Sequence, residues 1–77
     1  MKLEIISPSE IMFSGNVDSV TLPGIDGSFT VLKNHASLIS VLNPGKVIYK
    51  SEGGEVSIDI KGGLVDVDAN KIEVCVY

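Results

Sequence analysis

The sequence contains no Arg and no Trp, and it has one Cys and one His. Six Lys against ten Asp and Glu give a net charge of -4, so the basic surface that nucleic-acid binding requires is missing. One Cys excludes a disulfide framework, and one Cys with one His does not supply a zinc site. Two Ala against 19 Val and Ile argue against a helical bundle. We therefore expect a β protein with no metal, no cofactor and no nucleic-acid partner.

The length of 77 residues suits one domain, residues 1–77. A domain this small buries a modest share of its surface, so it must use its apolar residues efficiently or share them with a partner. No run of about 18 apolar residues is present, so we expect no direct membrane insertion. The first four residues, Met-Lys-Leu-Glu, fit neither a signal peptide nor a transit peptide.

Turn-forming residues recur at short intervals along the whole chain, with runs of about four to eight residues between them. This spacing predicts an all-β fold, a flattened sandwich or barrel of about ten short antiparallel strands in two sheets. Period-two alternation is clearest in residues 2–6, 55–60 and 71–76, which should each have one dry face. The apolar residues on those faces are Leu3, Ile5, Val56, Ile58, Ile60, Ile72, Val74 and Val76.

Residues 36–42 are apolar on both faces, which is typical of a buried strand or of a segment exposed at an interface. A strand is the preferred interpretation, and a helical turn is the alternative. Gly53-Gly54 and Ala69-Asn70 predict hairpin turns, with Gly and Asn supplying the left-handed conformations. Gly62-Gly63 lies between two runs without a polar turn sequence, which indicates a bulge, a corner or a close backbone approach.

Residues that could carry chemistry are few and isolated. His35 is the only imidazole and has no nucleophile or orienting acid beside it in the sequence, so a loop or surface contact is favoured over catalysis. Cys75 falls on the polar-patterned face of the last predicted strand, and Asp66 and Asp68 share one strand face, both as expected for ordinary exposed positions. Met12-Phe13 fits core packing and an exposed partner contact equally well. We therefore expect no enzyme activity.

The order of motifs resembles one known family. The motifs are Met12-Phe13-Ser14-Gly15, Val20-Thr21-Leu22-Pro23-Gly24, Asp26-Gly27-Ser28-Phe29 with Val31-Leu32, His35-Ala36, Asn43-Pro44-Gly45 and Gly62-Gly63-Leu64-Val65. Together they resemble the N-terminal β-domain of the epsilon subunit of F-type ATP synthase, over almost the whole chain. The resemblance implies a sandwich of two five-stranded sheets and a non-catalytic subunit of the central stalk. That subunit links gamma to the c-subunit ring, and so couples ion flow to ATP synthesis.

The resemblance also implies two contact regions and a location. The residues implied on the c-ring side are Gly27, Ser28, Lys33, Asn34 and His35. The residues implied on the gamma side are Ser7, Met12, Phe13 and Ile39. The expected location is peripheral, at the cytoplasmic face of the bacterial inner membrane. Relatives often have an acidic residue at the position of Ser28 and Pro-Gly before the histidine, where this chain has Lys33-Asn34. The family's inhibitory C-terminal helical hairpin is expected to be absent.

A different class remains open beside this one, a small all-β carrier or ligand-binding domain. Biotinyl and lipoyl carrier domains are acidic β-sandwiches of similar size that present a lysine at a hairpin tip. Lys33 and Lys61 are the nearest candidates for such a lysine, although neither has the expected neighbours.

Overall fold

The computed structural model describes all residues from Met1 to Tyr77, and they form nine strands and no helix. The strands are β1 (Lys2–Ile6), β2 (Ile11–Asn16), β3 (Ser19–Gly24), β4 (Gly27–Leu32), β5 (Leu38–Leu42), β6 (Gly45–Ser51), β7 (Gly54–Ile60), β8 (Gly63–Asp68) and β9 (Lys71–Val76). The all-β prediction is thus confirmed, with nine strands where about ten were expected. No helix is present that could cross a membrane.

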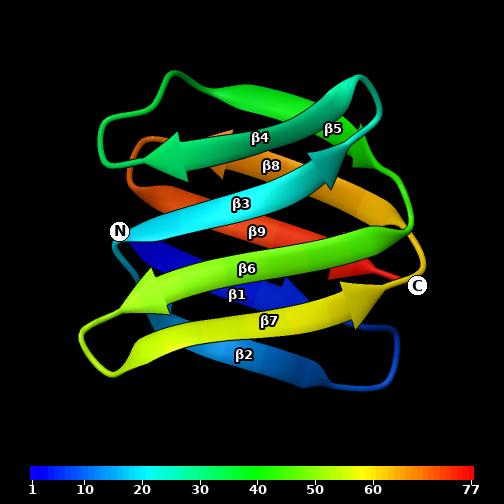
Figure 1. The fold of residues 1–77 in the computed structure, drawn as a ribbon, viewed down its shortest axis with the longest axis horizontal. Helices are drawn as coiled ribbons and strands as arrows, with labels where there is room; N and C mark the ends of the chain where they lie inside the picture. Colours follow the sequence, from blue (N-terminus) through cyan, green and yellow to red (C-terminus); the bar gives the residue numbers. More distant parts are fainter.

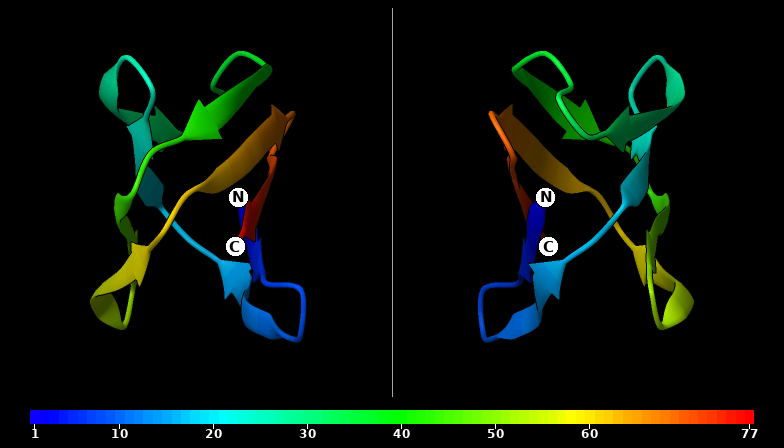
Figure 2. Two further views of the ribbon diagram at one scale, coloured as in Figure 1. Left: turned by 90° about the vertical axis from the view of Figure 1, so that its right-hand side faces the viewer. Right: turned by 90° about the vertical axis from the view of Figure 1, so that its left-hand side faces the viewer.

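The strands form two layers that face each other (Figure 1; Figure 2). One layer has the order β2-β1-β9-β8-β5, and the other has the order β4-β3-β6-β7. A single residue pair, Gly24 with Leu42, joins β3 to β5 and makes the two layers one continuous sheet. At the opposite end, β2 and β7 are both free edges.

One pairing departs from the antiparallel prediction. Strands β1 and β9 run parallel, with Leu3 beside Ile72 and Ile5 beside Val74. No hairpin connects these two strands, which lie at opposite ends of the sequence, so no short turn forces them to be antiparallel. All other strand pairs are antiparallel.

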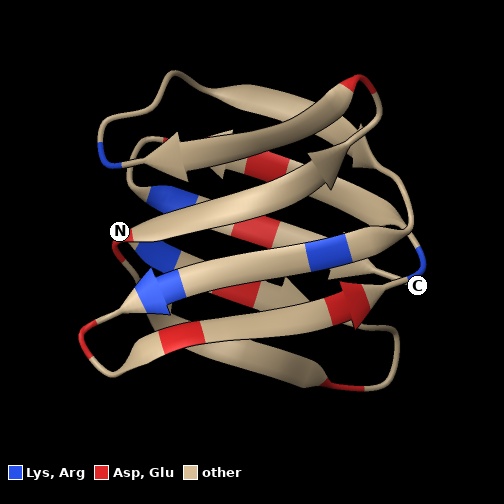
Figure 3. Ribbon diagram, in the orientation of Figure 1, with Lys and Arg blue, Asp and Glu red and all other residues tan.

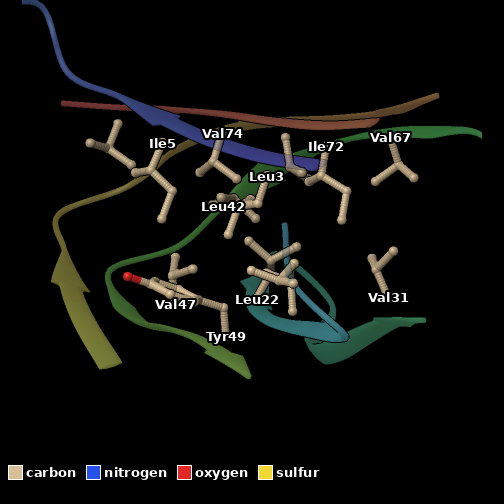
Figure 4. Packing of buried hydrophobic residues seen from close by; sticks show 14 of the residues in the cluster. Leu3, Ile5, Leu22, Val31, Leu42, Val47, Tyr49, Val67, Ile72 and Val74 are labelled. Carbon is tan, nitrogen blue, oxygen red and sulfur yellow. The ribbon is translucent and has the colours of Figure 1, made fainter. Parts of the chain in front are cut away.

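The core lies between the two layers and is almost entirely aliphatic (Figure 4). Alternation in β1 and β9 places Leu3, Ile5, Ile72, Val74 and Val76 in this core, as predicted. In β7 the prediction holds only in part: Ile60 is buried, Ile58 is half-buried and Val56 is 44% exposed. The physical reason is that β7 is an edge strand, and only its C-terminal end, which leads into β8, is buried.

Residues 36–42 do not form a helical turn, and Leu38–Leu42 is a strand, as preferred. At Gly62-Gly63 the predicted close approach is present, because a side chain at Gly63 would overlap the carbonyl oxygen of Cys75. The hairpin at Gly53-Gly54 also forms as predicted, with a φ of 121° at Gly54. In the β8–β9 turn, however, the left-handed residue is Ala69, with a φ of 53°, and not the expected Asn70.

Candidate functional site

The side chains that could act in catalysis or metal binding lie apart from one another. The Nδ1 atom of His35 donates a hydrogen bond to the carbonyl oxygen of the next residue, Ala36, at 2.7 Å. Cys75 is exposed on β9, and no group of three or more His, Cys, Asp and Glu side chains is arranged to hold a metal ion.

The outer face of the five-stranded layer carries a continuous row of apolar and weakly polar side chains. Cross-strand pairs join Ile11 to Ile6, Ile6 to Cys75, Cys75 to Leu64, and Leu64 to Val41. This apolar row therefore crosses all five strands. Ile11 is 63% exposed, Leu64 49% and Val41 47%. A contiguous exposed apolar surface of this kind marks a site of protein contact more often than scattered single residues do.

A second row lies beside the apolar row on the same face and is acidic. Glu4, Glu73 and Asp66 are direct cross-strand neighbours, so three carboxylates follow one another across β1, β9 and β8 (Figure 3). The Nζ atom of Lys71 lies 3.4 Å from a carboxylate oxygen of Glu73 and 3.7 Å from one of Glu4. A hydrogen bond with Glu73, then the charges of Glu73 and Glu4, raise the pKa of Lys71 above its ordinary value. Asp66 forms no ion pair.

The residues predicted for the gamma side fall at both edges of this outer face, with one exception. Met12 is 40% exposed beside the register shift in the β1–β2 ladder, and Ile39 on β5 is 75% exposed. Ser7 lies in the β1–β2 turn, where its hydroxyl accepts a hydrogen bond from the amide of Glu10 at 3.2 Å. Phe13 points the other way, into the space between the layers.

The apolar row connects these separated positions, and apart from Val41, in the segment 36–42, its members were not predicted as contact residues. Their outward direction was visible in the alternation of β8 and β9, but their lateral alignment depends on the parallel register of β1 with β9. The only sequence signal for the β5 end was the segment 36–42, which is apolar on both faces.

The residues predicted for the ring side lie along one edge of the molecule and not in one cluster. Gly27 and Ser28 begin β4, whereas Lys33, Asn34 and His35 follow its end. All five flank or belong to this edge strand, which pairs only with β3. An open depression of about 310 Å³ lies beside this edge, lined by residues 24–29 together with Leu38 and Ser40.

The lysine of a carrier domain has no counterpart at the hairpin tips. Ile25-Asp26, Glu52-Gly53 and Ala69-Asn70 occupy the tips of the three tight hairpins. Lys61 lies in the connection from β7 to β8, and Lys33 lies in the connection from β4 to β5. This placement does not favour the carrier interpretation.

Comparison with known proteins identifies relatives over the full length of the chain. The family described as "ATP synthase, Delta/Epsilon chain, beta-sandwich domain" matches residues 1–77. The ATP synthase epsilon chain of Sulfurovum sp. is 49% identical over 72 residues, covering 92% of this chain and 56% of that protein. The epsilon chain of Chlorobium limicola is 45% identical over 71 residues, covering 91% and 81%. The chain thus spans little more than half the length of the first relative.

Solved structures show the same fold at lower sequence identity. A chain in the mitochondrial ATP synthase of Euglena gracilis (OSCP/F1/c-ring) superimposes with a TM-score of 0.89 at 23% identity, over 96% of this chain and 48% of that chain. A chain in the central stalk/c-ring structure of the Tetrahymena thermophila enzyme gives 0.83 at 18% identity, over 97% and 61%.

Proposed function

This chain belongs to the ATP synthase delta/epsilon family of β-sandwich domains, and from that premise we propose that it is a non-catalytic subunit of the rotating central stalk. In this role it links the gamma subunit to the c-subunit ring, and so helps to couple ion flow to ATP synthesis. Its place is peripheral, at the cytoplasmic face of the bacterial inner membrane. Residues 1–77 act as one β-sandwich domain.

The observation that supports the gamma contact most directly is the apolar row of Ile11, Ile6, Cys75, Leu64 and Val41. Burying exposed apolar surface contributes about 25 cal/mol for each Å² removed from water, and the row offers such surface across a whole layer. The acidic row beside it would favour one orientation of a partner over others, because charges at an interface set register and specificity. Met12 and Ile39 extend the same face at its two edges.

The proposed ring contact uses a more polar surface. The edge formed by β4 and its two ends carries the small or polar residues Ser28, Asn34 and His35 and one cation, Lys33, beside the exposed Ile25 and Leu32. Ring loops would meet this edge through hydrogen bonds and charges. A substitution there should therefore change binding to the ring while leaving gamma binding intact.

Binding of the purified chain to its cognate gamma subunit tests the proposal. Leu64→Asp and Val41→Asp each place a charge in the apolar row and should weaken binding at least tenfold, which corresponds to about 1.4 kcal/mol. Val56→Asp is the matched control, because Val56 is a similarly exposed strand residue, 44% against 49% and 47%, on the other layer. Absence of binding at micromolar concentration, or equal losses in all three variants, would refute the proposed contact.

A further inference from the structure

The strand β4 is a free edge without the features that usually keep sheet edges apart. It pairs with β3 over six consecutive residue pairs without a register shift, and it has no partner on its other side. By contrast, β7 carries Glu55 and Asp59, and the β1–β2 ladder contains a register shift. Natural sheets protect their edges with charged residues, Pro or bulges, and residues 27–32 contain none of these.

The backbone of β4 presents hydrogen-bonding groups to the outside. Pro23 has no N–H and lies opposite Ser28, and its carbonyl oxygen accepts from the amide of Asn43 on the far side, at 2.8 Å. The pair of Pro23 with Ser28 therefore exchanges no hydrogen bonds, and alternation makes the same true of Thr30. The peptide groups of Ser28, Thr30 and Leu32 face the free edge. Of these groups, only the carbonyl of Leu32 is used in a turn, by the amide of His35.

The charges at the two ends of β4 determine which partner fits. Asp26 precedes the strand and Lys33 follows it, and neither forms an ion pair within the chain (Figure 3). A parallel copy of the strand would place Asp26 beside Asp26 and Lys33 beside Lys33. An antiparallel copy places each Asp26 at the same end of the pairing as Lys33 of the other copy, one residue away from the directly opposite position, which is favourable. We propose that β4 pairs antiparallel with β4 of a second copy of this chain, about a two-fold axis at Thr30.

This pairing accounts for the exposed apolar groups of the edge. Centred on Thr30, it sets Ser28 opposite Leu32 of the other copy and Phe29 opposite Val31. Leu32 is 57% exposed and Phe29 is half-buried in the single chain, so the pairing would reduce the solvent-exposed surface of both side chains. The pair is a weak one, because only one strand from each copy takes part. This edge also carries the residues proposed for the ring. The free chain would therefore use it for the dimer, and the assembled chain would use it for the ring contact.

Sedimentation of the whole chain between about 10 µM and 1 mM provides the first measurement, because a weak pair forms only toward the upper end of that range. Hydrogen exchange at the same two concentrations locates the interface. The amides of Ser28, Thr30 and Leu32 should exchange freely in the dilute sample and become protected in the concentrated one. A chain that remains a monomer at every concentration would overturn the proposal.

Two sets of variants separate this interface from any other. Thr30→Pro removes an amide that has no partner within the single chain and should weaken the dimer about tenfold, whereas Thr30→Val keeps the amide and should retain the dimer. Asp26→Lys alone and Lys33→Asp alone each place like charges together and should weaken it similarly, and the double exchange should restore it. If Thr30→Pro does not fold, the charge exchange alone decides. A dimer that tolerates Thr30→Pro, or whose charge variants show no restoration, lies elsewhere and would equally refute the proposal.

Discussion

The ring of Phe13 lies 4.3 Å from the ring of Tyr49, centroid to centroid, with the two planes inclined by 31°. Phe13 belongs to β2 and Tyr49 to β6, so this contact bridges the two layers near the edge where β2 and β7 leave the fold open. Tyr49 is buried, and Phe13 packs against the core. The neighbouring Met12 points outward. The sequence alone could not assign Met12 to the surface and Phe13 to the core, because β2 is an edge strand with a register shift.

Met12→Asp and Phe13→Asp should therefore separate binding from stability. Met12→Asp should change the free energy of unfolding by less than about 0.5 kcal/mol and weaken gamma binding, since its side chain is exposed on the proposed contact face. Phe13→Asp should cost about 3 kcal/mol, because it removes an aromatic contact and puts a charge beside the core. Denaturant unfolding and gamma binding of both variants measure the difference. Equal destabilisation by the two would show that Met12 is also a core residue.

The close approach at Gly63 gives a prediction about stability alone. A Cβ atom at this position would overlap the carbonyl oxygen of Cys75 on the paired strand, and backbone cannot move aside cheaply. Gly63→Ala should lower the free energy of unfolding by about 2 kcal/mol or more. Gly53→Ala is the control, because no atom lies within 4 Å of its added Cβ, and it should be neutral within about 0.5 kcal/mol. Comparable melting temperatures for the two variants would contradict this geometry.

The turn at Ala69 predicts a gain of stability. A left-handed conformation costs a residue with a side chain about 1 kcal/mol, and Ala69 adopts it with a φ of 53°. Ala69→Gly should stabilise the domain by about 0.5 kcal/mol after the greater freedom of Gly in the unfolded chain is subtracted. Ala36→Gly, at a position without a positive φ, should instead destabilise it by a similar amount. Thermal unfolding of the two variants should thus shift in opposite directions.

Local patterns predicted most of the fold, because they depend on side chains close in sequence. Alternation in β1 and β9 and the glycines at 53–54 and 62–63 each act over a few residues. The left-handed Ala69 escaped prediction because Asn70, beside it, is the better residue for that conformation. The parallel pairing of β1 with β9 also escaped, since it joins the two ends of the chain.

The candidate site was less accessible to sequence reasoning than the fold, for the same physical reason. Individual residues proposed for the gamma contact, such as Met12 and Ile39, followed from the resemblance to a family. The surface that joins them is made by the register of five strands. Leu64 and Cys75 look like ordinary outward residues until cross-strand pairing places them in one row. Register is a property of the assembled sheet, and one residue of slip would destroy the row.

The acidic row places like charges directly beside one another on the outer face of the five-stranded layer. Asp66 lies directly opposite Glu73 and has no cation bound to it, and like charges in direct cross-strand positions are destabilising. Asp66→Asn should therefore raise the free energy of unfolding by about 0.5 kcal/mol at low salt.

The matched control is Asp59→Asn on β7. The carboxylate of Asp59 lies 2.8 Å from Nζ of Lys46 on the neighbouring strand β6. Losing that exposed ion pair should leave stability unchanged or lower it by about 0.5 kcal/mol. In about 1 M salt both effects should shrink, because the Debye length falls to about 3 Å. A salt-independent gain in Asp66→Asn would mean that repulsion from Glu73 is not its cause. If repulsion is the cause, a partner that brings positive charge to this face would relieve the same repulsion.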